Sequence, residues 1–151
     1  CDIVLLLIYK FINQLEVRCL NAAEREDPMP FVQVDELPRM ELFPKVLSGL
    51  IAGEKLMLSF LDMAEGCVVP DHSHPHEQAG LVLAGKFRFR IGAEEKIAAS
   101  GDAFIVPPNV VHGGEVVEGP VKLLDIFSPP REDYVEKYNN FQQTSSGTLW
   151  E

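Results

Sequence analysis

The clearest pattern in the chain is the alternation of apolar and polar residues over short segments. Phe87, Phe89 and Ile91 alternate with Arg88 and Arg90, which is the period of a strand with one face turned to the core. The same pattern or a short apolar run predicts further strands at 31–34, 55–63, 81–83, 103–106 and 121–127. Short strands without intervening helices are typical of an all-β barrel or sandwich.

The turns and the C-terminal segment complete this picture. Gly92-Ala93 predicts a turn, and prolines at 107–108 and 129–130 mark places where strands should stop. Three aromatic residues follow at helical spacing, Tyr134, Tyr138 and Phe141. They predict one short C-terminal helix that docks through its aromatic side. We therefore divide the chain into a main domain over 29–135 and a helix end with a polar tail over 136–151.

The first 28 residues differ from the rest of the chain. An apolar run, Ile3–Ile12, leads into the charged stretch Glu24–Pro28. Residues 1–28 could be an N-terminal extension, or a strand or helix that packs on the domain or on a partner chain. The run is shorter than the roughly 20 apolar residues of a spanning helix, and Asp2 stands where a secretion signal would be cationic. We expect no membrane insertion and a cytoplasmic protein.

Composition narrows the classes of function. A chain of 151 residues with 46% hydrophobic residues suits one folded domain. Its net charge is −10 and it has no basic block, so nucleic acid is not an expected partner. The three cysteines, Cys1, Cys19 and Cys67, fit neither a zinc ribbon nor a disulfide framework. We expect free thiols in a reducing compartment.

The histidines are the first candidates for chemistry. Three of the four lie within five residues, as His72, His74 and His76, and His112 stands alone. Residues two apart on a strand point to the same face, so His72 and His74 could converge on one metal ion. The alternative is a histidine-rich loop on a charged surface.

The context of these histidines resembles the cupin superfamily. The first segment has Gly66, five residues, His72-Ser73-His74, three residues, Gln78, six residues and Gly85; the second has Gly101, five residues, Pro107 and His112 five positions on. Both spacings fit the two cupin motifs without a gap. The resemblance implies a single-domain cupin, an all-β jelly-roll barrel (double-stranded β-helix) with a short C-terminal helix. It also implies that His72, His74, Gln78 and His112 bind one divalent transition metal: nickel, zinc, iron or manganese.

The chain departs from the usual cupin motifs at three positions. Gln78 replaces the usual glutamate ligand, Asn109 stands at a usual glycine, and Val116 stands where an asparagine is frequent. Asparagine tolerates a positive φ, so the turn at Asn109 remains plausible. Three imidazoles and an amide are neutral ligands, so a bound ion would keep its +2 charge, attract an anion and act as a Lewis acid. The family pattern does not use His76 as a ligand.

A second candidate lies near the end of the last strand. Asp125 shares strand parity with Leu123 and Phe127, and a carboxylate on an apolar strand face is costly unless it is paired or functional. One interpretation is an Asp125–Arg131 ion pair that closes the barrel mouth. The other is an acid–base group, Asp125, beside an arginine, Arg131, that binds a substrate carboxylate.

The segment 123–133, with His-Pro-His-Glu-Gln ahead of it, resembles one cupin subfamily, the pectin-degradation proteins of the KdgF type. The resemblance implies an enzyme that converts 4,5-unsaturated monouronates into linear keto forms, with Asp125, Phe127 and Arg131 lining the pocket. Asp125 and Arg131 would be catalytic, and Phe127 and Arg131 would bind the small acidic substrate. We also expect a homodimer, as in other small cupins. The alternatives are another metal-dependent cupin, such as a dioxygenase or a cyclase on a small organic acid, and a non-catalytic sugar-binding module.

Overall fold

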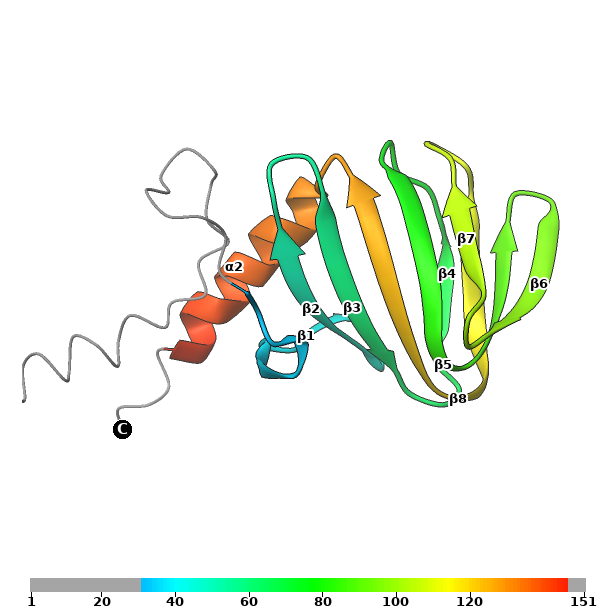
Figure 1. Cartoon of the computed structure of the whole chain (residues 1–151), viewed down its shortest axis with the longest axis horizontal. Helices are drawn as coiled ribbons and strands as arrows, with labels where there is room; N and C mark the ends of the chain where they lie inside the picture. Colours follow the sequence, from blue (N-terminus) through cyan, green and yellow to red (C-terminus); the bar gives the residue numbers. More distant parts are fainter. Residues whose placement is uncertain (1–30, 147–151) are drawn as a thin grey trace, which may run out of the picture.

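The structure is a computed structural model that describes residues 31–146, and it is an all-β fold with one C-terminal helix (Figure 1). The strands are β1 (Met40–Phe43), β2 (Val46–Ala52), β3 (Met57–Met63), β4 (Val68–His72), β5 (Glu77–Ile91), β6 (Glu94–Ala99), β7 (Ala103–Val106) and β8 (His112–Ser128). A short 3₁₀ turn, η2 (Val34–Glu36), precedes them, and the helix α2 (Glu132–Ser146) follows them. The all-β fold with a C-terminal helix, predicted from the sequence, is confirmed.

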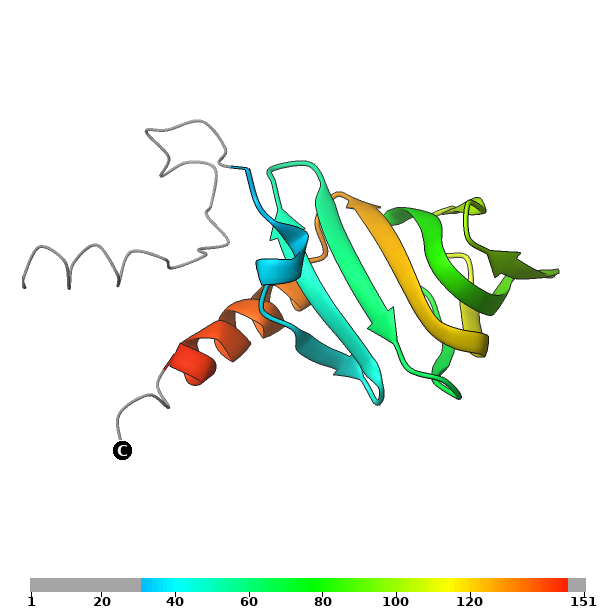
Figure 2. The same cartoon turned by 60° about the horizontal axis from the view of Figure 1, so that its bottom comes forward.

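Two long strands, β5 and β8, organise the sheet. The pairing order is β1-β2-β3-β8-β5-β6, and every pairing is antiparallel. The first part of β8 also pairs with β4, and the first part of β5 also pairs with β7. Because β5 and β8 run beside each other along their whole length, they connect the β3 side of the molecule to the β6 hairpin (Figures 1 and 2).

The bend in β5 is located at Gly85. The register between β5 and β8 shifts on both sides of this residue, whose φ is +77°. A Cβ at Gly85 would lie 2.6 Å from the carbonyl oxygen of Pro120 on β8. Only glycine accommodates both the backbone conformation and this close approach. The glycine of the first motif thus lets the two long strands bend together.

Side-chain alternation places one face of each long strand in the interior. Phe87 and Phe89 are buried, as their alternation with arginines predicted. On β8 the buried positions include Val121, Leu123, Asp125 and Phe127. Their shared orientation confirms the strand parity expected for Asp125, and it puts this carboxylate inside the fold.

The helix α2 packs against strands β1, β2 and β3, which form one end of the sheet (Figures 1 and 2). Tyr138 is 0% exposed, and its hydroxyl donates a hydrogen bond of 2.8 Å to the carbonyl of Pro38. Tyr134 and Phe141 pack on the same cluster of buried residues. The aromatic side of the predicted helix is therefore its docking side.

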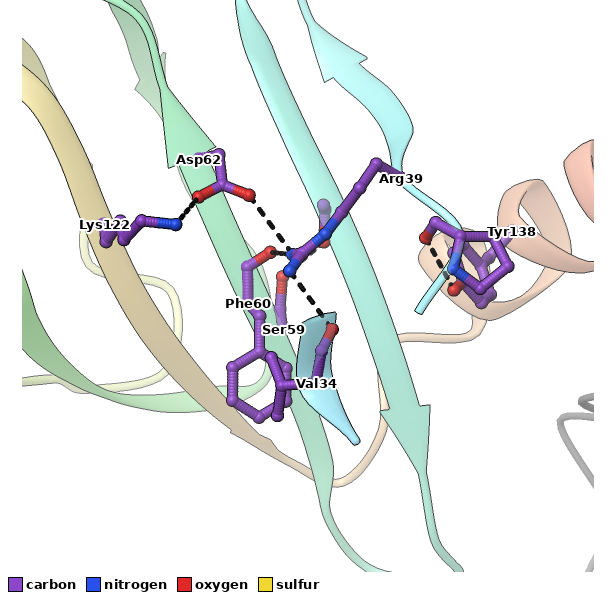
Figure 3. Close-up of polar contacts among 9 residues, drawn as sticks. Val34, Arg39, Ser59, Phe60, Asp62, Lys122 and Tyr138 are labelled. Atoms are coloured by element: carbon purple, nitrogen blue, oxygen red, sulfur yellow. Dashed lines mark hydrogen bonds and ion pairs between the residues drawn. The ribbon is translucent and has the colours of Figure 1, made fainter. Parts of the chain in front are cut away.

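Residues 31–34, expected to be a strand, do not form one. Residues 31–33 lie outside any regular element, and Val34 begins η2. Arg39 explains how this segment is held: its guanidinium donates to the carbonyls of Phe60 and Val34, at 2.9 and 3.2 Å, and lies 3.4 Å from Asp62 (Figure 3). The Arg39 side chain, and not strand pairing, thus connects Val34 to β3.

Several expectations fall outside the described residues. They concern the proposed extension 1–28 with its apolar run Ile3–Ile12, the thiols of Cys1 and Cys19, and the end of the tail at 147–151. Cys67 is buried with a free thiol. No helix within residues 31–146 is long and apolar enough to span a membrane. The cytoplasmic location remains a prediction.

Candidate metal centre and its pocket

Three histidines from different places in the fold converge on one point. His72 ends β4, His112 begins β8, and these two residues pair across the strands. His74 lies in the loop between β4 and β5. One ring nitrogen of each histidine lies within 4.8 Å of the others. The predicted convergence is present, but its cause is different: because β4 stops at His72, the loop and not strand parity directs His74.

The loop that carries His74 is held by the turn at Asn109. The backbone N–H of Asn109 donates a hydrogen bond of 2.7 Å to the carbonyl of His74. Asn109 has a φ of 64°, so the positive φ expected at this replaced glycine is confirmed. The second motif therefore supports the first through its backbone.

The ring orientations of His72 and His112 suit metal binding. Nδ1 of His72 lies 2.9 Å from the carbonyl of Pro70, and Nδ1 of His112 lies 2.8 Å from that of Val110. A carbonyl only accepts, so each Nδ1 carries the proton and each Nε2 keeps a lone pair, as in metal-binding histidines. Nε2 of His112 is buried without a hydrogen-bond partner in the described part of the chain.

His74 and Gln78 give a more specific indication of a cation. Nδ1 of His74 lies 3.1 Å from the carbonyl of His76, and its Nε2 lies 3.1 Å from Oε1 of Gln78. Burial, with smaller contributions from the charges of Arg131 and His112, lowers the pKa of His74 to about 4. A neutral imidazole has a single N–H, so one of the two contacts brings two acceptors together. A cation between Nε2 and Oε1 would remove that repulsion.

The residues therefore fit a divalent metal. Burial also lowers the pKa of His112, and a histidine ligand must be unprotonated to bind. Three imidazole nitrogens with an amide oxygen form a donor set that zinc, nickel, iron and manganese can all accept. His72, His74, Gln78 and His112 are the residues that could hold the ion.

The histidines border a cavity inside the barrel. It encloses about 500 Å³ of empty space, part of it open to solvent. The predicted site residues that line it are His72, Gln78, His112, Asp125, Phe127 and Arg131. His74 is not among the lining residues, but its ring lies 4.8 Å from that of His112 and 5.5 Å from that of Phe127. All the residues singled out from the two motifs and the last strand thus meet in one place.

Asp125 is a carboxyl in an unusual environment. It is 5% exposed, and burial raises its pKa to about 7, although a hydrogen bond from Gln78 and the charge of Arg131 act against that rise. Its Oδ1 has no hydrogen-bond partner between residues 31 and 146. Gln78 connects this carboxyl to His74. A group with such a pKa can accept and release protons near neutral pH.

Arg131 is paired with Asp133 instead of with Asp125. Its Nε and Nη2 donate to the two carboxylate oxygens of Asp133, at 3.1 and 2.6 Å. Its Nη1 is buried and has no partner in the described residues. The ion pair that would have closed the barrel mouth is therefore replaced by a local pair at the start of α2.

Sequence reasoning missed part of the cavity wall. Tyr134 lines it, but the sequence pattern assigned this residue only to helix docking. Leu42 and Phe43 also line it from β1, a strand that the sequence analysis did not predict. The sequence could have indicated that Tyr134 lies at the cavity, because it follows Arg131 by three residues, about one helical turn.

The fourth ligand can be tested by a matched pair of variants. Gln78→Ala should weaken metal binding more than His76→Ala, because Gln78 faces His74 whereas His76 lies outside the histidine cluster. Competition against a chromophoric chelator measures both affinities. Equal losses in the two variants would mean that Gln78 is not the fourth ligand.

Comparison with known proteins gives the family. The cupin domain family matches residues 59–127, which include all four candidate ligands. The pectin degradation protein KdgF of Dickeya dadantii (strain 3937) is 34% identical over 103 residues, 67% of this chain and 94% of that protein. KdgF from Halomonas sp. superimposes with a TM-score of 0.67 at 28% identity, over 71% of this chain and 99% of that one. An RmlC-like cupin from Shewanella frigidimarina gives a TM-score of 0.66 at 28% identity, over 71% and 96%.

The similarities to these three proteins extend over nearly their whole length, and the cupin domain match at residues 59–127 includes both histidine motifs. The resemblance predicted from the sequence is therefore confirmed. The chain belongs to the cupin superfamily and, within it, to the family of the pectin degradation protein KdgF.

Proposed function

We propose that the protein is a metal-dependent enzyme that linearises 4,5-unsaturated monouronates, the small sugar acids left by pectin or alginate breakdown. One observation carries this proposal. The histidine cluster borders a cavity that Asp125 and Arg131 also line, and within residues 31–146 Oδ1 of Asp125 and Nη1 of Arg131 are buried without a hydrogen-bond partner. Buried polar atoms without partners are rare in proteins, and a ligand with complementary groups satisfies them. The family relationship to a pectin degradation protein supports the same substrate class.

The reaction is an isomerisation with a simple proton balance. The anomeric hydroxyl loses a proton, the bond between C1 and the ring oxygen breaks, and C1 becomes an aldehyde. The electron pair of the broken bond stays on the ring oxygen, so an enolate is released at C5, and it becomes a ketone when C4 gains a proton. One proton therefore leaves the anomeric hydroxyl and one arrives at C4, with no change in oxidation state overall.

The residues of this chain have distinct roles in that reaction. Arg131 binds the carboxylate of the substrate, and Asp125 accepts and returns the proton. Phe127 forms an apolar wall of the cavity. A divalent ion held by His72, His74, Gln78 and His112 would supply Lewis-acid polarisation of a substrate oxygen.

The acidity of the protein does not oppose this substrate class. The net charge of −10 repels an anion at long range, but salt screens surface charges beyond about 8–10 Å. At the cavity, the guanidinium of Arg131 and the charge of a bound ion act at short range. Local attraction therefore decides whether a small acid binds.

The function is tested on purified, metal-loaded protein with 4,5-unsaturated monouronates. Turnover removes the conjugated double bond, so the absorbance of the substrate falls. An oxygen electrode in the same assay separates this activity from a dioxygenase, which would consume oxygen. Calorimetric binding of the uronate without any turnover would instead favour a sugar-binding module.

We further propose a homodimer that uses the outer face of the sheet. Leu81 and Ile105 are 37% and 58% exposed on neighbouring strands β5 and β7. Leu124 and Ile126 of β8 pair with the same part of β5 and continue this apolar face. Large apolar patches are rare on monomers, and a second copy with the same face would cover it by two-fold symmetry.

Light scattering tests the dimer. The wild-type protein should have twice the chain mass of 16.8 kDa. A Leu81→Glu/Ile105→Glu variant should have the chain mass, because each glutamate would place a charge in the interface. A wild-type mass of one chain at working concentration would contradict the proposal.

A further inference from the structure

We propose that Asp133 and Tyr134 are positioning residues that hold the Arg131 guanidinium in the orientation needed to bind a carboxylate through two hydrogen bonds. The site would then select sugar acids over neutral sugars through residues that need not touch the substrate. This inference rests on the proposed function, since it concerns the carboxylate-binding end of the same cavity.

The first support is the way in which Asp133 occupies Arg131. Its two carboxylate oxygens accept from Nε and from Nη2, so they take one edge of the planar guanidinium. Arginine has five N–H donors, of which three remain: both on Nη1 and one on Nη2. The edge between Nη1 and Nη2 is therefore available for a second carboxylate in the same bidentate geometry.

The second support is the ring beneath the guanidinium. The central carbon of Arg131 lies 3.7 Å from the ring centroid of Tyr134, within the range of a cation–π interaction. The Tyr134 ring in turn meets the Phe127 ring edge to face, with centroids 6.0 Å apart. The plane of the guanidinium is thereby fixed by the ring of Tyr134, which is itself fixed by the wall of the cavity.

The third support is the backbone at the start of α2. The carbonyl of Arg131 accepts the N–H groups of Tyr134 and Val135, at 3.1 and 3.0 Å. Arg131, Asp133 and Tyr134 are thus held together by the first turn of the helix. Nη1 of Arg131 remains buried without a partner within the described ranges, and Arg131 lines the cavity.

Positioning and simple charge predict opposite effects for Asp133. If Asp133 acted only through its charge, its removal would make the site more positive and would tighten anion binding. If it orients Arg131, its removal frees a flexible side chain and weakens the binding of a carboxylate. The direction of the change in affinity therefore separates the two roles.

The test uses galacturonate, a saturated monouronate, and galactose, its neutral counterpart, with calorimetry on the metal-loaded protein. Asp133→Asn should weaken galacturonate binding about tenfold, the scale of a lost hydrogen bond to a charged group. Tyr134→Leu should weaken it about three- to tenfold, whereas Tyr134→Phe, which keeps the ring, should bind as the wild type does. Glu136→Gln removes an exposed charge one turn further along α2 and should change nothing.

Galactose binding should not change in any of these variants, and Arg131→Ala should remove the preference for galacturonate. Tighter or unchanged galacturonate binding in Asp133→Asn would overturn the inference, as would a wild-type protein without a preference for the acid.

The proposed function can fail independently of this inference. A protein that selects galacturonate but does not turn over unsaturated uronates would contradict that function alone, and full uronate turnover with an unchanged KM in Asp133→Asn would contradict the positioning role alone.

Discussion

Asp125→Asn should lower the turnover of a 4,5-unsaturated monouronate by about 10²–10⁴-fold, the usual effect of losing a general acid–base group. The amide keeps the shape of the carboxyl but cannot carry a proton between substrate atoms. Metal content should not change, because the structure places Asp125 beside Gln78 and not among the candidate ligands. Steady-state kinetics with elemental analysis of the same sample measures both quantities.

Two further variants separate catalysis from stability. Arg131→Ala should raise KM as well as lower kcat, because it removes the partner of the substrate carboxylate. Asp62→Asn provides a matched control. Asp62 is also a strand carboxylate, but it pairs with Lys122 and Arg39 at 2.8 and 3.4 Å (Figure 3), and it does not line the cavity. This control should change the thermal midpoint and not the turnover.

A purely structural role of Asp125 would give a different result. Asp125→Asn would then change the thermal midpoint and leave the specific activity of the folded protein at the wild-type value, as Asp62→Asn should. Thermal melts and kinetics on the three variants therefore decide between the two interpretations of the buried carboxyl.

The second large effect concerns the metal. The wild-type protein should purify with about one transition metal ion per chain, or take one up on reconstitution, and a His72→Ala/His112→Ala variant should do neither. The variant removes two of four donors, and His72 and His112 both have an Nε2 that is free of its own proton. Elemental analysis gives the stoichiometry. His76→Ala serves as the histidine control and should keep the metal.

If the wild-type protein contains no metal and takes up none on reconstitution, the assignment of these residues as a metal site is contradicted. Thermal stability offers an independent measurement. An ion that binds only the folded state raises the thermal midpoint. Addition of metal should therefore raise the midpoint of the apo wild type and leave that of the double variant unchanged.

The strands with an unambiguous pattern were predictable from the sequence. The alternation around Phe87 and Phe89 and the prolines after β7 and β8 corresponded to real elements, because a half-buried strand requires that period and proline cannot continue a ladder. Strands β1, β2, β4 and β6 were not predicted. Strands β1 and β2 do carry apolar strand patterns that were overlooked, whereas β4 and β6 have few apolar residues at strand spacing. Their sheet positions come from pairing with neighbours, which local sequence does not report.

The residues of the candidate site could be predicted where the motif spacing identifies them. They could not be predicted where the local conformation of the chain decides which side chains meet. Residues 72, 74, 78 and 112 were selected from the motif spacing, and the structure brings them together. The partner of Arg131 was not predictable, since Asp133 and Asp125 are both within reach along the chain. Helix α2 begins at Glu132, and in the structure both carboxylate oxygens of Asp133, in its first turn, accept from the Arg131 guanidinium.

The most direct test of the account is the absorbance of a 4,5-unsaturated monouronate in the presence of the purified protein, with and without bound metal. We expect metal-loaded wild type to remove the absorbance of the conjugated double bond without consuming oxygen. Neither the apo protein nor metal-loaded Asp125→Asn should do so at a comparable rate. An unchanged absorbance with fully metal-loaded wild type would contradict the proposed function.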